Sequence, residues 1–466
     1  MRQLIIVFIF CFKLIAAQEV QKNLFGFATS NTFTYCDIND TSFMNKVTDL
    51  NPKVLRFPGG AVGNYYHFGG SGYGFDFQEI EKYDAGKFLK RAEGLVRDAS
   101  KKGHTHDYIN DFIILAKATN SQVILVANMF VDNDDIIKII TKIIANDIEI
   151  IGVELGSELT NRYFFQKGYT IDDYLISAKR YSDIVKLHFP KIKTAIVAAP
   201  LGKPKNHRHN IWNNKLAELD YYDAVIVHSY AKVIKGKDLF GQMILEEDEG
   251  LSKKETFNMY KSRVINFFAN DLPDEIKRYN TIFNKPIWVT EWNLQMSKTT
   301  GNTMFQSLFV SNYLLEILSN KDLANISITT YHNLAGRTVS GSIFKGDNES
   351  FITHSTYFPF SMLSSLFEEN IIQIKKNKMK DKDVYVYNCY NSDNKIQMIY
   401  IINWSNKDFD YRVNKNMNLF NSFYSKNLYD RANEKGMLSS DSYMLGGDYN
   451  LLIRPYSISV IEGKNE

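Results

Sequence analysis

Eight short apolar segments, spread over the first 331 residues, constrain the fold of this chain more than any other feature. They are continuous apolar runs rather than alternations of apolar and polar positions, which is the pattern of parallel strands buried on both faces. The expected strands are residues 24–29, 53–57, 122–128, 149–156, 194–199, 224–230, 286–291 and 326–331.

Amphipathic segments occupy the intervals between these strands. Apolar residues recur at helical spacing over 108–116, 136–144 and 304–318, which come before the third, fourth and eighth strands. Thr170, followed by Asp173, has the pattern of a capping box at the start of another helix. Strands that alternate with helices in this way predict an α/β fold, a (β/α)8 TIM barrel, and the alternative is a doubly wound open sheet.

The sequence changes character near Lys378. Short aromatic and β-branched segments follow, separated by Asn, Asp and Gly, as in antiparallel sheets. We therefore expect the barrel to extend over residues 18–370 and a C-terminal antiparallel β-sandwich domain to extend over residues 371–466.

Residues 1–17 have the features of a secretory signal peptide. Arg2 provides the positive charge, residues 4–12 form the apolar stretch, and Ala16 and Ala17 precede an expected cleavage site. We expect a mature chain that is secreted or periplasmic, with no membrane span. In such a protein Cys36 and Cys389 can form a disulfide or remain separate thiols.

The overall charge excludes one class of partner and leaves others open. The chain has 55 Lys and Arg against 52 Asp and Glu, so nothing indicates a nucleic-acid footprint. No Cys/His cluster has metal-ligand spacing, and we expect neither a metal nor a cofactor. His207 and His209 lie in a polar segment after Pro204 and are interpreted as solvated. The sequence does not indicate an oligomeric state.

The ends of the predicted strands collect most of the candidate functional residues. In a (β/α)8 barrel the active side chains lie at the C-terminal ends of strands. Here those positions hold Arg56, Asn128, Glu158, His228, Tyr230, Glu291 and His332.

Two of these residues are carboxylic acids that follow apolar runs, where a charge is costly unless it has a partner or a function. A facing pair such as Glu158 and Glu291 is what glycoside hydrolysis requires, with one acid as proton donor and the other as nucleophile or base. A structural ion pair is the alternative interpretation. Glu154 would point the same way as Glu158 along an extended strand, and is the rival for the acid role.

Four short segments occur in order at these strand ends: LRFPGG (55–60), ELGSE (154–158), HSY (228–230) and TEW (290–292). They resemble segments of clan A of the glycoside hydrolases, especially the heparanase/β-glucuronidase, arabinofuranosidase and xylosidase-like branches. The resemblance implies a retaining glycosidase that acts on a poly- or oligosaccharide. It implies Glu158 as acid/base, Glu291 as nucleophile, Arg56 as the cation that holds the nucleophile, and an aromatic side chain of HSY in contact with it. From these motifs and the strand-end positions together, we expect the substrate-binding residues to be Arg56, Asn128, Ser157, His228, Tyr230, Trp292 and His332.

Two positions depart from the pattern of those enzymes. Ser157 stands where they have an Asn whose amide binds the sugar 2-hydroxyl, and a serine hydroxyl is shorter with fewer donors. The eighth strand offers Tyr331 and His332 in place of the usual Trp. Either the substrate differs at its 2-position or activity is reduced. A catalytically weakened barrel that binds glycans is therefore the alternative function. Trp292 fits either a sugar platform or barrel packing.

Overall fold

The computed structural model describes residues 21–463, except 105–106, 133, 235–249, 339–340, 347–349, 369, 378, 414–415, 433–437 and 447–448. The predicted signal peptide, residues 1–17, lies outside the described residues. Within the described part of the chain, no helix combines the length and the apolar character needed to cross a bilayer.

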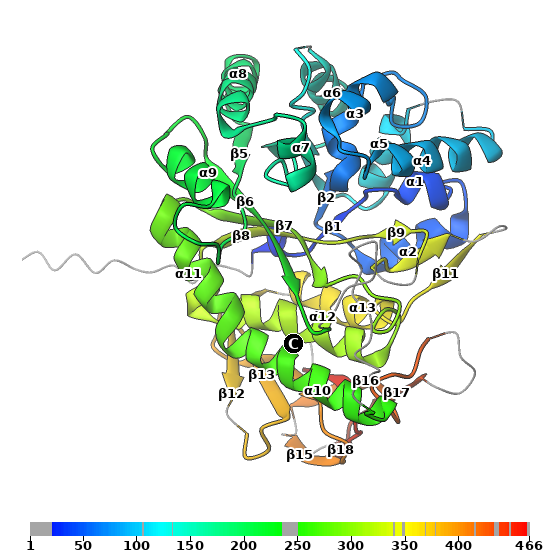
Figure 1. The fold of residues 1–466 in the computed structure, drawn as a ribbon. Coiled ribbons are helices and arrows are strands. Elements are labelled where there is room, and N and C mark those ends of the chain that lie inside the picture. The colour runs from blue at the N-terminus through cyan, green and yellow to red at the C-terminus, as the bar shows by residue number, and fades with distance from the viewer. Residues whose placement is uncertain are drawn as a thin grey trace, which may run out of the picture.

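Eight parallel strands close into a barrel in the order of the sequence (Figure 1). β1 pairs with both β2 and β8, which closes the barrel and rules out the open-sheet alternative. All eight predicted strands are present: β1 (Gly26–Ala28), β2 (Val54–Phe57), β3 (Gln122–Val126), β4 (Ile150–Leu155), β5 (Lys193–Val197), β6 (Ala224–Ala231), β7 (Ile287–Leu294) and β8 (Ile326–Tyr331).

Helices fill the intervals between the strands, and three of the predicted ones occur close to the expected bounds. These are α5 (Ile109–Ala118), α6 (Asp135–Ile144) and α12 (Met304–Ser319). The capping box of α8 (Ile171–His188) is also present. The other helices are α1 (Thr32–Tyr35), α2 (Thr41–Leu50), α3 (Phe77–Tyr83), α4 (Leu89–Lys101), α7 (Arg162–Gln166), α9 (Arg208–Ala217), α10 (Lys253–Asn266), α11 (Leu272–Phe283) and α13 (Tyr357–Ser364), with short helical turns at η1 (Lys22–Leu24), η2 (Gly60–Tyr65), η4 (Phe267–Asp271), η5 (Lys321–Leu323) and η6 (Ser365–Phe367).

The C-terminal part is an antiparallel sandwich, as the sequence predicts. A six-stranded sheet has the order β12-β13-β14-β19-β16-β17, and a two-stranded sheet pairs β15 with β18. The strands are β12 (Ile371–Asn377), β13 (Val384–Asn391), β14 (Ile396–Asn403), β15 (Phe409–Val413), β16 (Met417–Ser425), β17 (Leu438–Met444), β18 (Tyr449–Ile453) and β19 (Ser457–Gly463). A small sheet of β9 (Ala335–Gly336), β10 (Phe344–Gly346) and β11 (Phe351–Thr353) follows β8.

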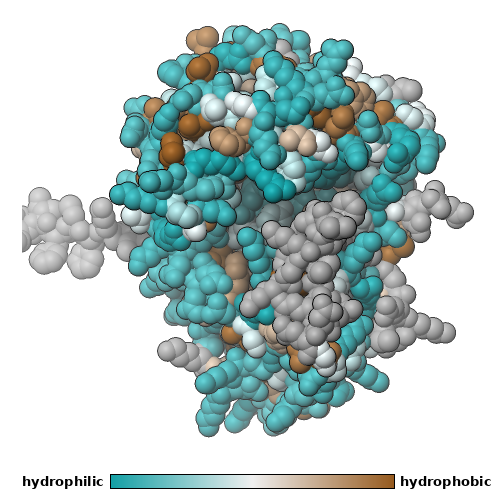
Figure 2. All heavy atoms as spheres, viewed as in Figure 1, coloured by the Kyte–Doolittle hydropathy of each residue, from teal (hydrophilic) through white to brown (hydrophobic). Residues whose placement is uncertain are grey.

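Side chains along β13 and β14 alternate between two hydrophobic cores, which explains how the larger sheet packs on both of its faces. Val386 and Ile401 belong to a core shared with the two-stranded sheet, whereas Tyr387 and Tyr400 belong to the core that continues into the barrel. Because neighbouring residues of a strand point to opposite faces, one sheet joins both cores. The face of the molecule in Figure 2 is mainly hydrophilic, with apolar residues in small scattered groups.

Helix α12 connects the two parts of the molecule. It contacts β7 of the barrel and also β12, β14 and β19 of the larger sheet, and Figure 1 shows it between them. This position explains why α12 is buried around its whole circumference over residues 304–317. Its Asn312 accepts a hydrogen bond from Trp404 Nε1 (2.8 Å) and donates one to the Tyr387 hydroxyl (3.1 Å).

Replacing Asn312 with alanine should destabilise the protein at this junction. The change leaves the buried Trp404 N–H without an acceptor, and an orphaned buried polar group costs about 1–3 kcal/mol. We expect a clear fall in the midpoint of urea unfolding. Asn270→Ala is the matched control, because Asn270 is exposed and its side chain donates to Asn266, which is also exposed. Equal midpoints for the two variants would contradict the assigned role of Asn312.

The two cysteines that remain after residue 20 do not form a disulfide in the structure. Cys36 and Cys389 are both free and buried. Burial raises the pKa of the Cys36 thiol to about 12, so this thiol stays protonated at neutral pH.

Candidate active site

A fully buried arginine lies at the centre of the site. Arg56 of β2 donates from Nε and Nη2 to the two carboxylate oxygens of Glu154 (both 2.7 Å) and from Nη1 to Glu291 Oε1 (2.9 Å). Burial of a cation is tolerated only when it is paired and its donors are satisfied. Here one cation faces two carboxylates, so the cluster can keep Glu291 fixed and ionised.

Glu291 is held on three sides within β7. Besides the contact with Arg56, its Oε2 accepts a hydrogen bond from the Tyr230 hydroxyl (2.6 Å) and lies 3.5 Å from His332 Nδ1. Burial raises the pKa of Glu291, but the charges of His228 and Arg56 and the hydrogen bond from Tyr230 outweigh it, so the pKa lies well below its ordinary value. The strand continues to Leu294, so Glu291 lies inside β7 rather than at its end.

Glu158 reaches the barrel mouth through a tight turn after β4. The strand ends at Leu155, and Gly156 has a φ of +87°. A Cβ at Gly156 would lie 2.3 Å from Leu159 Cδ1, so only glycine fits this turn. Glu158 itself has a φ of +51°, a region that non-glycine residues rarely occupy and that recurs at functional sites.

This turn corrects the expected relation between the two acids of ELGSE. An extended strand would have pointed Glu154 and Glu158 the same way, but the strand stops between them. Glu154 is fully buried against Arg56, whereas the Glu158 side chain is 44% exposed. Asn64 of η2 fastens the turn, because its side chain donates to Ser157 O (2.6 Å) and accepts from Ser157 N (2.8 Å).

His228 connects the two candidate acids. His228 Nδ1 forms a 3.1 Å hydrogen bond with Glu158 Oε1 and lies 3.6 Å from Glu291 Oε2. One carboxylate oxygen of each glutamate and one ring nitrogen of His228 lie within 4.8 Å of one another. His228 and Tyr230 are two residues apart in β6, and this spacing explains why both reach the same carboxylate pair.

The protonation of Glu158 and His228 is shared between them. Burial raises the pKa of Glu158, but the hydrogen bond and charge of His228 outweigh it, so the pKa of Glu158 lies below its ordinary value. Burial lowers the pKa of His228, but Glu291 and Glu158 outweigh it, so the pKa of His228 is raised. The pair therefore keeps one proton beside an ionised Glu291, and the two groups titrate together.

The same three side chains have the spacing of metal ligands. They could hold a divalent cation only against the charge of Arg56, which already bonds Glu291 at 2.9 Å. Hydrogen bonds among the three groups and Tyr230 also use the same atoms. The arrangement favours proton transfer and attack by a carboxylate over metal binding.

The structure brings together six of the residues selected from the sequence. Arg56, Glu158, His228, Tyr230, Glu291 and His332 form one connected cluster. Ser157 is fully buried behind this cluster, where Arg56 Nη2 donates to its hydroxyl (3.2 Å), and it does not line the cavity described below.

Two other selected residues lie away from the carboxylate pair. Asn128 donates to Glu79 Oε1 (2.9 Å). Trp292 is 1% exposed and stacks on Tyr313, with ring centroids 4.1 Å apart and planes 6° apart. The geometry of Trp292 is that of barrel packing, and neither residue lines the cavity. Their substrate-binding roles therefore stay predictions from the sequence.

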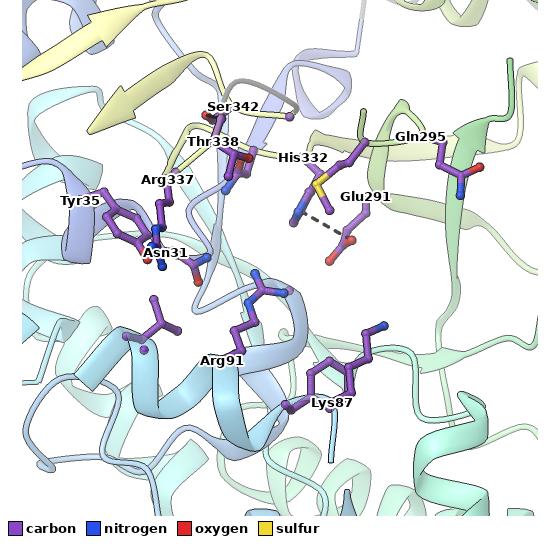
Figure 3. Close-up of a pocket in the computed structure, with 18 of the residues that line it drawn as sticks. Asn31, Tyr35, Lys87, Arg91, Glu291, Gln295, His332, Arg337, Thr338 and Ser342 are labelled. Atoms are coloured by element: carbon purple, nitrogen blue, oxygen red, sulfur yellow. Dashed lines mark hydrogen bonds and ion pairs between the residues drawn. The ribbon is translucent and has the colours of Figure 1, made fainter. Parts of the chain in front are cut away.

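A cavity of about 700 Å³ opens beside the pair and is lined by both Glu158 and Glu291. Figure 3 shows Glu291 and His332 on one side of this space and Arg91 of α4 and Lys87 on the other. Most of the lining comes from segments after β2, β7 and β8, and apart from Gly60 and His332 the sequence motifs did not include these residues. Such loop residues carry no periodic signal that would have selected them.

A second cavity of about 310 Å³ shares Glu158 with the first and is also lined by His228. It is also lined by His209, which is only 8% exposed. The interpretation of His209 as a solvated loop residue is therefore wrong. The segment forms α9, with His207 as its N-cap, and this helix turns His209 inward. Burial lowers the pKa of His209 to about 4, so the ring is neutral at pH 7.

Comparison with known proteins gives matches in structure but not in sequence. No protein-family profile and no curated protein sequence matches the chain. A GH51 arabinofuranosidase from Xanthomonas axonopodis pv. citri superposes with a TM-score of 0.64 at 11% identity, covering 96% of this chain and 97% of the other. An α-L-arabinofuranosidase from Thermotoga maritima, in complex with arabinose, gives a TM-score of 0.61 at 14% identity, covering 95% and 97%.

A GH30 endoxylanase from Clostridium papyrosolvens gives a TM-score of 0.50 at 13% identity, covering 96% of this chain and 97% of the other. The superpositions extend over both the barrel and the sandwich. At these identities they establish the fold and no more. The chain has the fold of the clan A glycoside hydrolases, a (β/α)8 barrel with a C-terminal β-sandwich, as the four strand-end motifs indicated.

Proposed function

We propose that the chain is a retaining glycoside hydrolase that cleaves O-glycosidic bonds of a poly- or oligosaccharide. The observation that carries this proposal is the pair of Glu158 and Glu291 at one barrel mouth, with carboxylate oxygens within 4.8 Å. Carboxyl groups lie about 5–5.5 Å apart in retaining enzymes and about 6.5–9.5 Å apart in inverting ones. The spacing of this pair falls on the short side of that division, which favours retention.

In the first step Glu291 is the nucleophile. Its carboxylate attacks the anomeric carbon while Glu158 gives its proton to the glycosidic oxygen, so the leaving sugar departs as an alcohol. Arg56 and Tyr230 hold Glu291 ionised and aimed, as the contacts of 2.9 Å and 2.6 Å indicate. His228 supports Glu158 through the 3.1 Å hydrogen bond and can return the shared proton to it.

In the second step Glu158 is the base. It takes a proton from water, the water oxygen attacks the anomeric carbon, and the bond to Glu291 breaks to restore the carboxylate. Two inversions give net retention. The Glu158 side chain is 44% exposed against 6% for that of Glu291, which suits a group that must meet both a leaving alcohol and incoming water.

We also propose that the chain acts outside the cytoplasm, as a secreted or periplasmic enzyme. Support comes from the charged, apolar and small-residue regions of residues 1–17.

A panel of aryl glycosides and polysaccharides tests the proposed function. We expect release of aryl alcohol or reducing sugar, and NMR of the first product should show the anomeric configuration of the substrate. A product of inverted configuration would overturn the retaining mechanism. Glycan binding with no turnover of any substrate would instead favour the alternative function, a weakened barrel, for which Ser157 is the motivating observation.

Tyr230→Phe should shift the acid limb of the pH profile of kcat/KM to higher pH. The variant lacks the 2.6 Å hydrogen bond that lowers the pKa of Glu291. Glu291 must be ionised to attack, so activity is lost as pH falls through its pKa, and a higher pKa moves that loss upward. Tyr449→Phe, at an exposed position of β18, is the control. An unchanged acid limb in Tyr230→Phe would remove Tyr230 from the aiming role.

A further inference from the structure

We propose that the substrate is an anionic glycan, whose carboxylate or sulfate groups bind the cations that surround the carboxylate pair. This inference rests on the proposed function, because it concerns the substrate of the same site. The neighbours in structure are named as arabinofuranosidases and an endoxylanase, and these names indicate no charged substrate.

The charge of the larger cavity differs sharply from that of the whole chain. The chain is nearly balanced, with 55 basic and 52 acidic residues. Of the 25 residues that line the cavity, seven are Lys or Arg and two are acidic, and those two are Glu158 and Glu291. Among the described residues, every charged side chain of the lining other than the catalytic pair is therefore a cation.

These cations come from four separate segments at the barrel mouth. The segment between β2 and β3 supplies Lys87 and, from α4, Lys90, Arg91 and Arg97. In Figure 3, Arg91 projects from α4 into the space that Glu291 and His332 face, with Lys87 nearby. Cations from one helix alone could form an ordinary solvated helix face, but other segments also supply cations to this cavity.

The remaining cations follow three other strands. Lys232 comes after β6, Lys298 after β7 and Arg337 after β8. They lie on segments distant in sequence that meet only around the cavity. The barrel fold thus brings cations from four segments to one cavity, as expected for a site that binds a charged ligand.

Most of these cations have no carboxylate partner to neutralise them. Lys87, Lys90, Arg91 and Lys298 form no ion pair within the described residues. Arg97 and Arg337 both approach the single carboxylate of Asp98, each at 3.8 Å. Arg56, in contrast, is paired on two sides, so it serves the catalytic cluster and not the ligand.

The field of the cations reaches the catalytic groups. After burial and His228, the charge of Lys87 is among the causes that set the pKa of Glu158, and it acts to lower it. Arg91 likewise helps to lower the pKa of His332, beside the larger effect of burial. An anion bound to Lys87 would offset its charge and favour the protonated form of Glu158, which is the form that the first step requires.

Positive charge continues on the other side of Glu158. The second cavity is lined by Arg162 and Arg208, and its only described carboxylate is Glu158. An anionic chain can therefore meet cations on both sides of the bond that Glu158 protonates. Because the carboxylate pair between these cations suits the cleavage of a glycosidic bond, an anionic glycan is the favoured polyanion over a nucleic acid.

The test measures binding by the full chain carrying Glu291→Gln, so that no probe is consumed. The probes are polygalacturonate (carboxylate only), dextran sulfate (sulfate only), neutral dextran, neutral arabinan and single-stranded DNA. We expect one of the two anionic glycans to bind at least about tenfold more tightly than either neutral glycan, with an affinity that falls as salt is added. Which of the two binds identifies the anionic group.

A pair of matched double variants shows where the binding occurs. Lys87→Gln/Arg91→Gln should weaken binding of the preferred glycan on the order of tenfold. Lys277→Gln/Arg278→Gln, at exposed positions of α11 outside both cavities, changes the net charge equally and should have little effect. Equal losses in the two double variants would overturn the proposal, as would equal affinity for neutral glycans or tighter binding of DNA.

Turnover separates this inference from the proposed function. If the wild-type protein hydrolyses only neutral glycosides and binds them as tightly as polyanions, the glycosidase proposal holds and the proposal of an anionic substrate is wrong. If the protein binds an anionic glycan selectively but hydrolyses no substrate, the proposal of an anionic ligand holds and the glycosidase proposal is wrong.

Discussion

Glu291→Ala is expected to reduce turnover by roughly 10⁴-fold or more, since it removes the nucleophile of the first step. The loss should be similar for activated and unactivated substrates, because both require a bond to the anomeric carbon. The other groups of the site, including Arg56 held by both oxygens of Glu154, remain in place. The measurement is kcat/KM on an aryl glycoside panel, with thermal unfolding to verify the fold.

Azide gives this variant a diagnostic second readout. The alanine leaves space beside Arg56, where a small anion can bind and attack the anomeric carbon directly. A single displacement yields a glycosyl azide of inverted configuration. Glu291→Gln should not be rescued, because its side chain fills the same space. Glu218→Ala, at an exposed position beyond α9, is the control and should behave as wild type. Rescue with retained configuration would contradict the assignment of Glu291 as the nucleophile.

The barrel could be predicted from the sequence because each of its strands is buried on both faces. A run such as Val123–Val126 is apolar and buried throughout, so its position in the sequence marks its position in the fold. Strands of the C-terminal sandwich are half polar and less distinct. β16 (Met417–Ser425) and β18 (Tyr449–Ile453) have a weak strand pattern in the sequence, because Asn and Ser interrupt the first and the second is short.

The catalytic cluster could be predicted because strand ends converge in a closed barrel. Arg56, His228 and Glu291 lie on different strands, and only the topology brings them together. The prediction that Glu154 and Glu158 point the same way was wrong, because their directions depend on single backbone torsions. The turn at Gly156 separates the directions of Glu154 and Glu158, and no hydropathy pattern records a positive φ.

The cations of the cavity could not have been selected from the sequence. Lys87, Lys298 and Arg337 are single charged residues in irregular segments, where a solvated side chain is the ordinary expectation. Their common location appears only when four loops are folded over one mouth. A composition near neutrality hides such clusters, because the sum over the chain carries no information about where charges gather.

Glu158→Gln is expected to fail selectively, and so to differ from the loss of Glu291. Substrates with poor leaving groups need a proton, and kcat/KM on them should fall by about 10²–10⁴-fold. Substrates with good leaving groups need little protonation, so their kcat/KM should stay within about tenfold of wild type. Their kcat should still fall, because the second step lacks its base. Azide needs no deprotonation and should restore kcat, with a product of retained configuration.

The basic limb of the pH profile gives an independent readout of Glu158. In the wild type, activity falls as pH rises and the Glu158–His228 pair loses its shared proton. Glutamine does not titrate, so this limb should disappear from kcat/KM on poor leaving groups in Glu158→Gln. A limb that persists unchanged would place the essential proton on another group.

Glu154→Gln distinguishes Glu158 from its rival for the acid role. Glu154 bonds Arg56 with both oxygens and is fully buried, so it can act on substrate only through Arg56 and Glu291. Its loss leaves Arg56 with Glu291 as its sole carboxylate partner and should disturb the nucleophile. Activity should then fall equally for good and poor leaving groups, and the protein should be less stable. If Glu154→Gln spared only good leaving groups while Glu158→Gln did not, the two acids would exchange roles.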